Sequence, residues 1–321
     1  MKYRRLGRTA LRVSELCLGT MNFGPRTSQE DSFEILNASM DAGINFIDTA
    51  NQYGGHLGVG TTESILGAWF AEDPARRDKV VLATKVHEPM SDDINDRGLS
   101  ARHIQQACDA SLQRLGIEHI DLYQMHHLDR SAPVDEIWLA MDRLIAQGKI
   151  TYVGSSNFPG WSIAQANEQA RAAHRLGIVS EQSLYNLVER RVEMEVIPAC
   201  EAYGVGLIIW SPLAGGLLAG QAGEAGGRRD SPDIQQQRNE RAEQLNGFES
   251  LAQELDCSPS SLALAWLLHQ PTVVSTIIGP GAMRQLSSVL NVPEIALDEA
   301  ALARLDELFP PVGPAPEAYA W

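Results

Sequence analysis

Three stretches decide the fold of this 321-residue chain: INFIDTA at 44–50, VVLATK at 80–85 and IDLYQMH at 120–126. Each is a short apolar run with a polar residue at or near its end, and these residues are Asp48, Lys85 and His126. Tyr53 follows Asp48 by five positions. Because segments with helical spacing separate the runs, they predict buried parallel strands joined by helices. Parallel strands of one barrel end on the same side, so we expect these side chains to share one mouth.

The same alternation continues over most of the chain. Strands are expected at 17–20, 44–50, 80–85, 120–126, 149–156, 178–182, 205–210 and 273–279. Helices are expected at 28–42, 61–73, 100–115, 133–147, 161–175, 192–203, 241–255, 258–269 and 283–291. Eight such units predict an α/β protein with a closed (β/α)8 TIM barrel, and residues 1–13 predict an N-terminal β-hairpin. A doubly wound sheet would need a G-x-G-x-x-G turn after a strand, and the chain has none. We therefore interpret residues 1–321 as a single domain.

Two irregular segments complete the chain. Residues 214–240 are rich in glycine and leave the seventh strand at its C-terminal end, so we expect a long loop that covers a cofactor at the barrel mouth. Residues 309–321 (FPPVGPAPEAYAW) form a proline-rich tail with two terminal aromatics, Tyr319 and Trp321. Aromatics at the end of a stiff tail often dock on a surface. Tyr319 and Trp321 could dock on the pocket or on a neighbouring subunit, and the sequence does not distinguish these two sites.

Composition excludes several classes of function. The chain has 41 acidic and 26 basic residues and a net charge of −15, which argues against nucleic acid and anionic membranes as partners. Its four cysteines are far apart and form no CxxC motif, so no metal site and no disulfide framework is expected. The N-terminus has no secretory signal pattern. We expect a reduced, cytoplasmic protein, and the sequence does not fix its oligomeric state.

Six motifs together carry a resemblance to a known family. They are FIDTANQY at 46–53, ATK at 83–85, DLYQMH at 121–126, GSSNF at 154–158, EQ at 181–182 and WSPL at 210–213. In this order and spacing, over essentially the whole chain, they resemble the aldo-keto reductases. The resemblance implies an eight-stranded barrel that binds a nicotinamide cofactor without a Rossmann domain. It also implies a catalytic tetrad of Asp48, Tyr53, Lys85 and His126.

The residue types of this tetrad suit the delivery of a proton to a carbonyl group. A free tyrosine has a pKa of about 10, too high for ready proton exchange at neutral pH. A neighbouring ammonium stabilises the phenolate and lowers that pKa. Tyr53 would therefore be the general acid, Lys85 would tune it, Asp48 would hold Lys85, and His126 would orient the carbonyl. The expected reaction is the reversible reduction of an aldehyde or ketone, with hydride from C4 of the nicotinamide.

The resemblance also implies the residues that hold the cofactor. Ser156, Asn157 and Gln182 would bind the nicotinamide carboxamide, and Trp210 would stack on the ring. Further contacts would come from Thr20 and Met21 beneath the ribose and nicotinamide, and from Ser211, Leu213 and Gly216 at the pyrophosphate.

The chain departs from the family pattern near its last strand. The family segment resembles G-A-R-T-x-x-Q-L-x-x-N, in which the arginine binds the 2′-phosphate of NADP. Here the segment is GPGAMRQLSSV at 279–289, with Gly279 and Gln285 retained but Gly281 in the arginine position. Val289 stands in the position of the asparagine, and Arg284 offers a cation one turn away. NADPH remains the expected cofactor, but the loss of an arginine–phosphate contact makes NADH use compatible with the sequence.

Two other functions compete with a carbonyl reductase. A cofactor-sensing regulatory subunit, similar to the potassium-channel β subunits, would use the same barrel for a different purpose. An aldolase with Lys85 as a Schiff base would leave Gln182 and the Ser156–Asn157 pair without a role. The intact tetrad favours the reductase.

Overall fold

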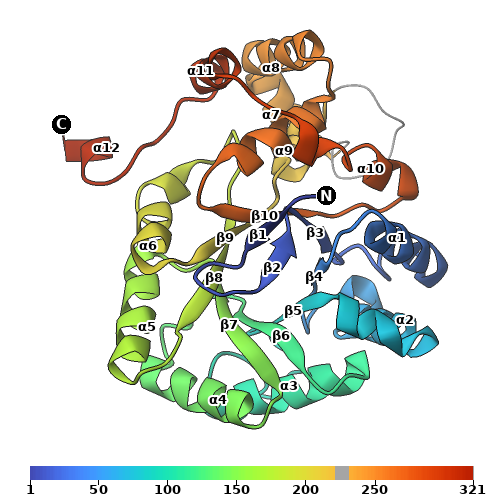
Figure 1. Cartoon of the computed structure of the whole chain (residues 1–321), viewed down its shortest axis with the longest axis vertical. Helices are drawn as coiled ribbons and strands as arrows, with labels where there is room; N and C mark the ends of the chain where they lie inside the picture. The colour runs from blue at the N-terminus through green and yellow to red at the C-terminus, as the bar shows by residue number, and fades with distance from the viewer. Residues whose placement is uncertain (221–230, 321) are drawn as a thin grey trace.

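The structure, a computed structural model, describes residues 1–220 and 231–320 (Figure 1). Its centre is a closed parallel barrel with the strand order β10-β3-β4-β5-β6-β7-β8-β9. The strands are β3 (Leu16–Gly19), β4 (Phe46–Asp48), β5 (Val81–Val86), β6 (Ile120–Met125), β7 (Ile150–Ser156), β8 (Ile178–Leu184), β9 (Gly206–Trp210) and β10 (Val273–Ile278). The predicted (β/α)8 barrel is confirmed.

The N-terminal hairpin covers one end of this barrel. Strands β1 (Tyr3–Arg5) and β2 (Arg12–Ser14) pair antiparallel, as predicted. Leu6 and Val13 are fully buried and pack in one cluster with inward-facing strand residues, among them Phe46 and Leu122. Because the hairpin covers one end of the barrel interior, the other end, where the parallel strands finish, is left for a binding site.

Helices surround the barrel, and most bury their apolar faces against the outside of the strands, whereas α8 packs against α9 and α11 packs against α8 (Figure 1). They are α1 (Gln29–Asp41), α2 (Thr61–Glu72), α3 (Ala101–Leu115), α4 (Val134–Ala146), α5 (Gly160–Ala172), α6 (Val196–Tyr203), α8 (Ala242–Glu254), α9 (Pro259–His269), α10 (Met283–Ser287) and α11 (Glu299–Leu308). Several begin at a side-chain cap: Ser28, Ser100 and Ser258 each accept a hydrogen bond from the backbone N–H three residues on. No helix within the described ranges is long and apolar enough to cross a membrane.

The expected loop at 214–240 is partly helical, so that part of the prediction is wrong. A short 3-10 turn covers Ala214–Ala219, and α7 covers Pro232–Glu240. Ser231 caps α7 and proline occupies its first turn, a combination that favours a helix start. Residues 221–230, the centre of the expected cofactor-covering loop, lie outside the described residues.

The chain after 291 also differs from expectation. Helix α11 was not predicted, although Asp298 caps it and Ala301 and Leu305 are buried at a spacing of four. In the tail, the backbone N–H groups of Val312 and Gly313 donate to Glu193 Oε2. The short helix α12 (Glu317–Ala320) projects away from the barrel, and Tyr319 is 71% exposed (Figure 1). Thus the main chain anchors the tail while Tyr319 does not dock on this chain, and Trp321 is outside the described residues.

Candidate active site

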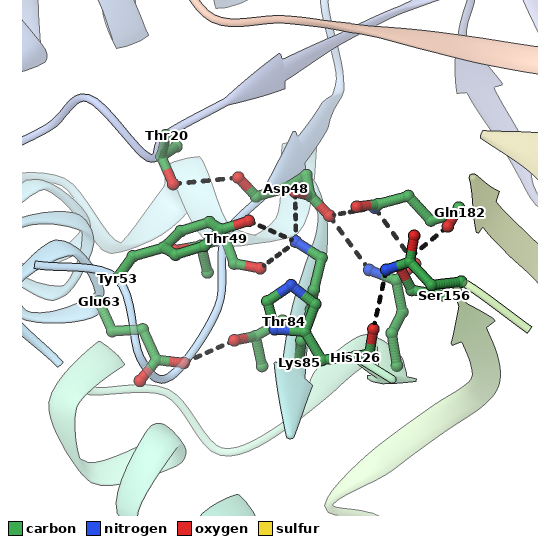
Figure 2. A network of polar contacts seen from close by, with 12 residues as sticks. Thr20, Asp48, Thr49, Tyr53, Glu63, Thr84, Lys85, His126, Ser156 and Gln182 are labelled. Atoms are coloured by element: carbon green, nitrogen blue, oxygen red, sulfur yellow. Dashed lines mark hydrogen bonds and ion pairs between the residues drawn. The ribbon is translucent and has the colours of Figure 1, made fainter. Parts of the chain in front are cut away.

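The four residues of the expected tetrad come from neighbouring strands at one end of the barrel. Asp48 is the last residue of β4, Lys85 lies near the end of β5, and His126 follows β6 directly. Tyr53 lies in the loop after β4. Because β4, β5 and β6 are adjacent in the barrel, the structure brings all four side chains together (Figure 2).

Lys85 is the centre of this group. Its Nζ donates to Asp48 Oδ2 at 2.5 Å, to the carbonyl oxygen of Thr49 at 2.8 Å and to Tyr53 Oη at 3.2 Å. The side chain is completely buried. Burial alone would lower the pKa of Lys85, but the charges of Asp48 and Tyr53 and the hydrogen bonds to both outweigh it and leave the pKa raised. All three N–H groups of the Lys85 ammonium therefore donate hydrogen bonds, and one of them points at the phenol oxygen of Tyr53.

Asp48 is held on both of its carboxylate oxygens. Oδ2 accepts from Lys85, and Oδ1 accepts from Gln182 Nε2 at 2.7 Å and from Gln124 Nε2 at 3.1 Å. The contact of Gln182 was not expected, since the resemblance implies a role on the cofactor. Gln124 was not identified at all, although strand alternation places it on the same face of β6 as the position of His126.

His126 is a neutral imidazole beside the phenol. Its ring meets that of Tyr53 edge-on, with centroids 6.1 Å apart. Burial, and after it the charges of Lys85, His127 and His87, lower the pKa of His126 from 6.5 to about 2. A neutral ring carries one N–H, so His126 can donate a single hydrogen bond to a carbonyl oxygen without adding a charge.

His127 has a different environment from its neighbour. Its Nε2 lies 3.0 Å from Glu88 Oε1, and its Nδ1 lies 3.4 Å from Asn157 Nδ2. Its ring stacks on that of His126, with centroids 4.9 Å apart. Ligand-type atoms of Glu88, His126 and His127 lie within 4.8 Å of one another, although no metal site was expected from the sequence. His127 therefore links Glu88, in the loop after β5, to Asn157, which follows β7.

Ser156, Asn157, Gln182 and Trp210 form one wall of the mouth. Ser156 Oγ donates to the carbonyl oxygen of Gln182 at 2.9 Å (Figure 2). Asn157, at a positive φ of 58°, donates from Nδ2 to the carbonyl oxygen of His126 at 3.1 Å. Its Oδ1 accepts from Trp210 Nε1 at 3.0 Å. The ends of β7, β8 and β9 thereby present amide, hydroxyl and indole groups next to the tetrad.

The segment after β9 is a tight backbone turn. Ser211 has a φ of 53°, and Gly215 and Gly216 have φ values of 68° and 106°, which favour glycine. The N–H of Gly215 donates to Ser211 Oγ at 3.3 Å, and Leu213 is half-buried. The N–H groups of Ala214 and Gly216 also donate within the turn, to the carbonyl oxygens of Ser211 and Leu213.

The segment after β10 lies against the loop after β3. Asn22 Nδ2 donates to the carbonyl oxygen of Gly279 at 2.8 Å, and the N–H of Gly281 donates to Gln285 Oε1 at 2.6 Å. Arg284 and Gln285 are exposed, on α10. Gly281 does not have a positive φ, and an added Cβ would meet its nearest atoms at 3.6 Å, an ordinary contact. Nothing in the backbone therefore requires glycine at 281.

Thr20 and Met21 follow β3 at the same end of the barrel. Thr20 is buried and its Oγ1 donates to the carbonyl oxygen of Asp48 at 3.0 Å, whereas Met21 is 44% exposed. Thr20 thus supports the strand that carries Asp48. Met21 is open to a ligand.

Comparison with known proteins places these features in a family. The sequence model of the Aldo/keto reductase family matches residues 15–309. An uncharacterized oxidoreductase, YrpG, of Bacillus subtilis is 48% identical over the full length of both chains. A probable voltage-gated potassium channel subunit beta of Oryza sativa is 35% identical over 89% of each chain. Norsolorinic acid reductase B of Dothistroma septosporum is 31% identical, with 97% of this chain and 82% of that protein covered.

Proposed function

Because the chain belongs to the aldo/keto reductase family, we propose that it is an NAD(P)H-dependent oxidoreductase that reversibly reduces an aldehyde or ketone to the alcohol. The family generally uses NAD(P)H and acts on small carbonyl compounds. One observation carries the proposal: the buried ammonium of Lys85 contacts Asp48 and the phenol oxygen of Tyr53 at the same time.

Tyr53 is the proton donor in this proposal. In reduction, its phenolic proton moves to the carbonyl oxygen, and the ammonium of Lys85 stabilises the phenolate that remains. In oxidation, the phenolate takes the proton of the alcohol. Asp48 keeps Lys85 charged and in place, and neutral His126 donates a hydrogen bond that orients the carbonyl. The bound nicotinamide supplies the hydride.

The wall formed by β7, β8 and β9 fits the nicotinamide group. Ser156, Asn157 and Gln182 would hold the carboxamide, whose donors and acceptor match amide and hydroxyl groups. Oε1 of Gln182 accepts no hydrogen bond from the described residues and is not sealed in the core, which leaves it open to a ligand. Trp210 would lie against the ring. The rest of the cofactor would be held by Thr20, Met21, Ser211, Leu213, Gly216, Gly279, Arg284 and Gln285.

The preference of this chain for NADPH over NADH should be weak. Gly281 offers no guanidinium to a 2′-phosphate, and Arg284 is an exposed cation on the following turn. The Arg228–Arg229 pair, another source of charge, lies outside the described residues. We propose NADPH as the main cofactor, with a weaker preference over NADH than an arginine at 281 would give.

A regulatory subunit is the second candidate, favoured by the similarity to plant proteins named as probable potassium channel β subunits. The test is the oxidation of NADPH and NADH, followed by absorbance, with a panel of aldehydes and ketones. Tyr53→Phe serves as the matched control. Turnover that requires Tyr53 supports the reductase. Tight cofactor binding with no turnover on any substrate would support the regulatory subunit instead.

A further inference from the structure

We propose that Gln124 is a positioning residue for the proton transfer, which acts with Gln182 by holding the second carboxylate oxygen of Asp48. The catalytic meaning of this inference rests on the proposed function. The hydrogen bonds themselves are properties of the fold.

Two side-chain amides converge on one oxygen atom. Gln182 Nε2 lies 2.7 Å from Asp48 Oδ1, while Lys85 Nζ donates to Oδ2 (Figure 2). Gln124 Nε2 lies 3.1 Å from the same Oδ1. The two amides also approach each other, with Gln182 Nε2 3.4 Å from Gln124 Oε1. Both glutamines are buried, and Gln124 is fully so. Lys85 therefore holds one carboxylate oxygen of Asp48, and the two glutamines hold the other. All three side chains together set the orientation of the carboxylate.

The neighbouring strand makes room for Gln124. Gly154 of β7 is paired with Gln124 in the barrel. A Cβ at Gly154 would approach Ser180 Oγ to 2.6 Å, closer than real contacts allow, and Gln124 Cγ to 3.1 Å, tighter than most contacts. The glycine of the GSSNF motif thus leaves space for Ser180 and for the side chain of Gln124, which reaches Asp48.

The two amides affect the phenol through charge. Each turns the positive end of its dipole toward Asp48 and so offsets part of the carboxylate charge that competes with the phenolate for Lys85. Without Gln124, the carboxylate would draw the Lys85 protons more strongly, and the phenolate of Tyr53 would be less stabilised. Removal of Gln124 should therefore raise the pH at which Tyr53 ionises. Gln182 would still hold the cofactor.

The test compares Gln124→Met with wild type by NMR titration of tyrosines labelled at Cζ. Tyr53→Phe assigns the Tyr53 signal. We expect the midpoint to rise by about 0.5–1 pH unit, and kcat for reduction to fall about three- to tenfold, since one pKa unit corresponds to a tenfold change. The KM for the carbonyl and the Kd of the cofactor should stay within about twofold. Asn167→Leu is the control, because it removes another buried amide, on α5, that bonds Arg8 and the carbonyl oxygen of Ile163.

The titration needs no turnover, which separates this inference from the proposed function. A Tyr53 midpoint in Gln124→Met equal to that of wild type would overturn the positioning role, even in an active enzyme. If the Tyr53 midpoint rises in Gln124→Met but the wild-type protein has no reductase activity, the positioning role of Gln124 is supported and the proposed function is rejected. If Gln124→Met does not fold, Gln124→Leu replaces it. It also lacks the donor to Asp48 Oδ1, so the midpoint must rise again, and a lowered or unchanged midpoint would reject the inference.

Discussion

The two sides of the barrel mouth are built differently. On the proton-transfer side, strand-borne side chains are buried and paired: Lys85 makes three hydrogen bonds, and Asp48 is held on both oxygens. On the side expected to bind the cofactor phosphates, the turn at 211–216 and the segment 279–285 offer mostly backbone groups and exposed side chains. Loss of Lys85 or Asp48 on the first side leaves a buried charge unpaired, whereas a change on the second side is expected to alter only contacts with a ligand. The chain departs from the family pattern on the second side, at Gly281.

The largest expected effect tests the first side. Tyr53→Phe removes only the transferable proton, so reduction should slow by about 10²–10⁴-fold, the range for general acid catalysis. Cofactor affinity, measured by fluorescence titration, should be nearly unchanged. A variant that kept the wild-type kcat with its best aldehyde would show that Tyr53 is not the acid.

Lys85→Met should also slow reduction, by about 10- to 100-fold, and move its pH profile upward because the phenolate loses its ammonium. Methionine has a volume similar to that of lysine, so packing alone would tolerate the change. The lost charge would not be tolerated as well. Removal of one partner of a buried ion pair leaves an uncompensated charge and costs about 3–5 kcal/mol of stability.

A double variant separates the two effects of Lys85. Asp48→Asn combined with Lys85→Met removes both charges, so most of the lost stability should return in denaturant unfolding. Activity should not return, because the ammonium is still absent. If the double variant recovers the activity as well, the role of Lys85 is structural.

The sequence gives a physical reason for the grouping of residues on the first side, but not for the geometry of the second side. Asp48, Lys85 and His126 lie at or just after strand ends, and the period of the strands and the closure of the barrel bring such positions together. No comparable rule governs Gly215 or Gln285, whose positions depend on local turns. Gln124 was missed because a polar residue inside an apolar strand gives no sign of its partner, which here is 76 positions away.

The missed helices show a second limit. Helix α7 has little apolar character and no buried residue, so periodicity carries no signal for it, and only Ser231 and Pro232 mark its start. Helix α11 is the opposite case, because its cap at Asp298 and its buried residues Ala301 and Leu305 can be read from the sequence, although the helix was not predicted.

A buried acid in the wall formed by β7, β8 and β9 gives a prediction about stability. Glu181 is completely buried, and burial raises its pKa from 4.5 to about 7 despite hydrogen bonds from Ser155, Ser183 and the N–H of Phe158. Because the folded protein holds this proton more tightly than the unfolded chain, the stabilisation is complete below about pH 4.5. It is lost as the pH rises through about 7. The loss is about 3 kcal/mol, from 1.36 kcal/mol per pKa unit.

Glu181→Gln should remove this part of the pH dependence. The amide resembles the protonated acid: its Oε1 can still accept from Ser183 and from the N–H of Phe158, and its Nε2 can donate to Ser155 Oγ. Unfolding free energies from denaturant titration at pH 5 and pH 8 should therefore fall more steeply in wild type than in the variant. If the unfolding free energy falls by the same amount between pH 5 and pH 8 in both proteins, Glu181 is already ionised in the folded protein at pH 5. The folded protein would then tolerate a buried charge at this position.

The smallest expected effect tests the second side. Gly281→Arg should tighten NADP⁺ binding and leave NAD⁺ nearly unchanged, because only NADP⁺ carries the 2′-phosphate. The gain should be about 1.5–3 kcal/mol, the range for hydrogen bonds to charged groups. Strain should not reduce it, since residue 281 lacks a positive φ and has room for a Cβ. Fluorescence titration of both cofactors into both proteins measures the change. If wild type instead prefers NADP⁺ strongly and Arg284→Ala abolishes that preference, Arg284 already binds the phosphate, and the second side is as specific as the first.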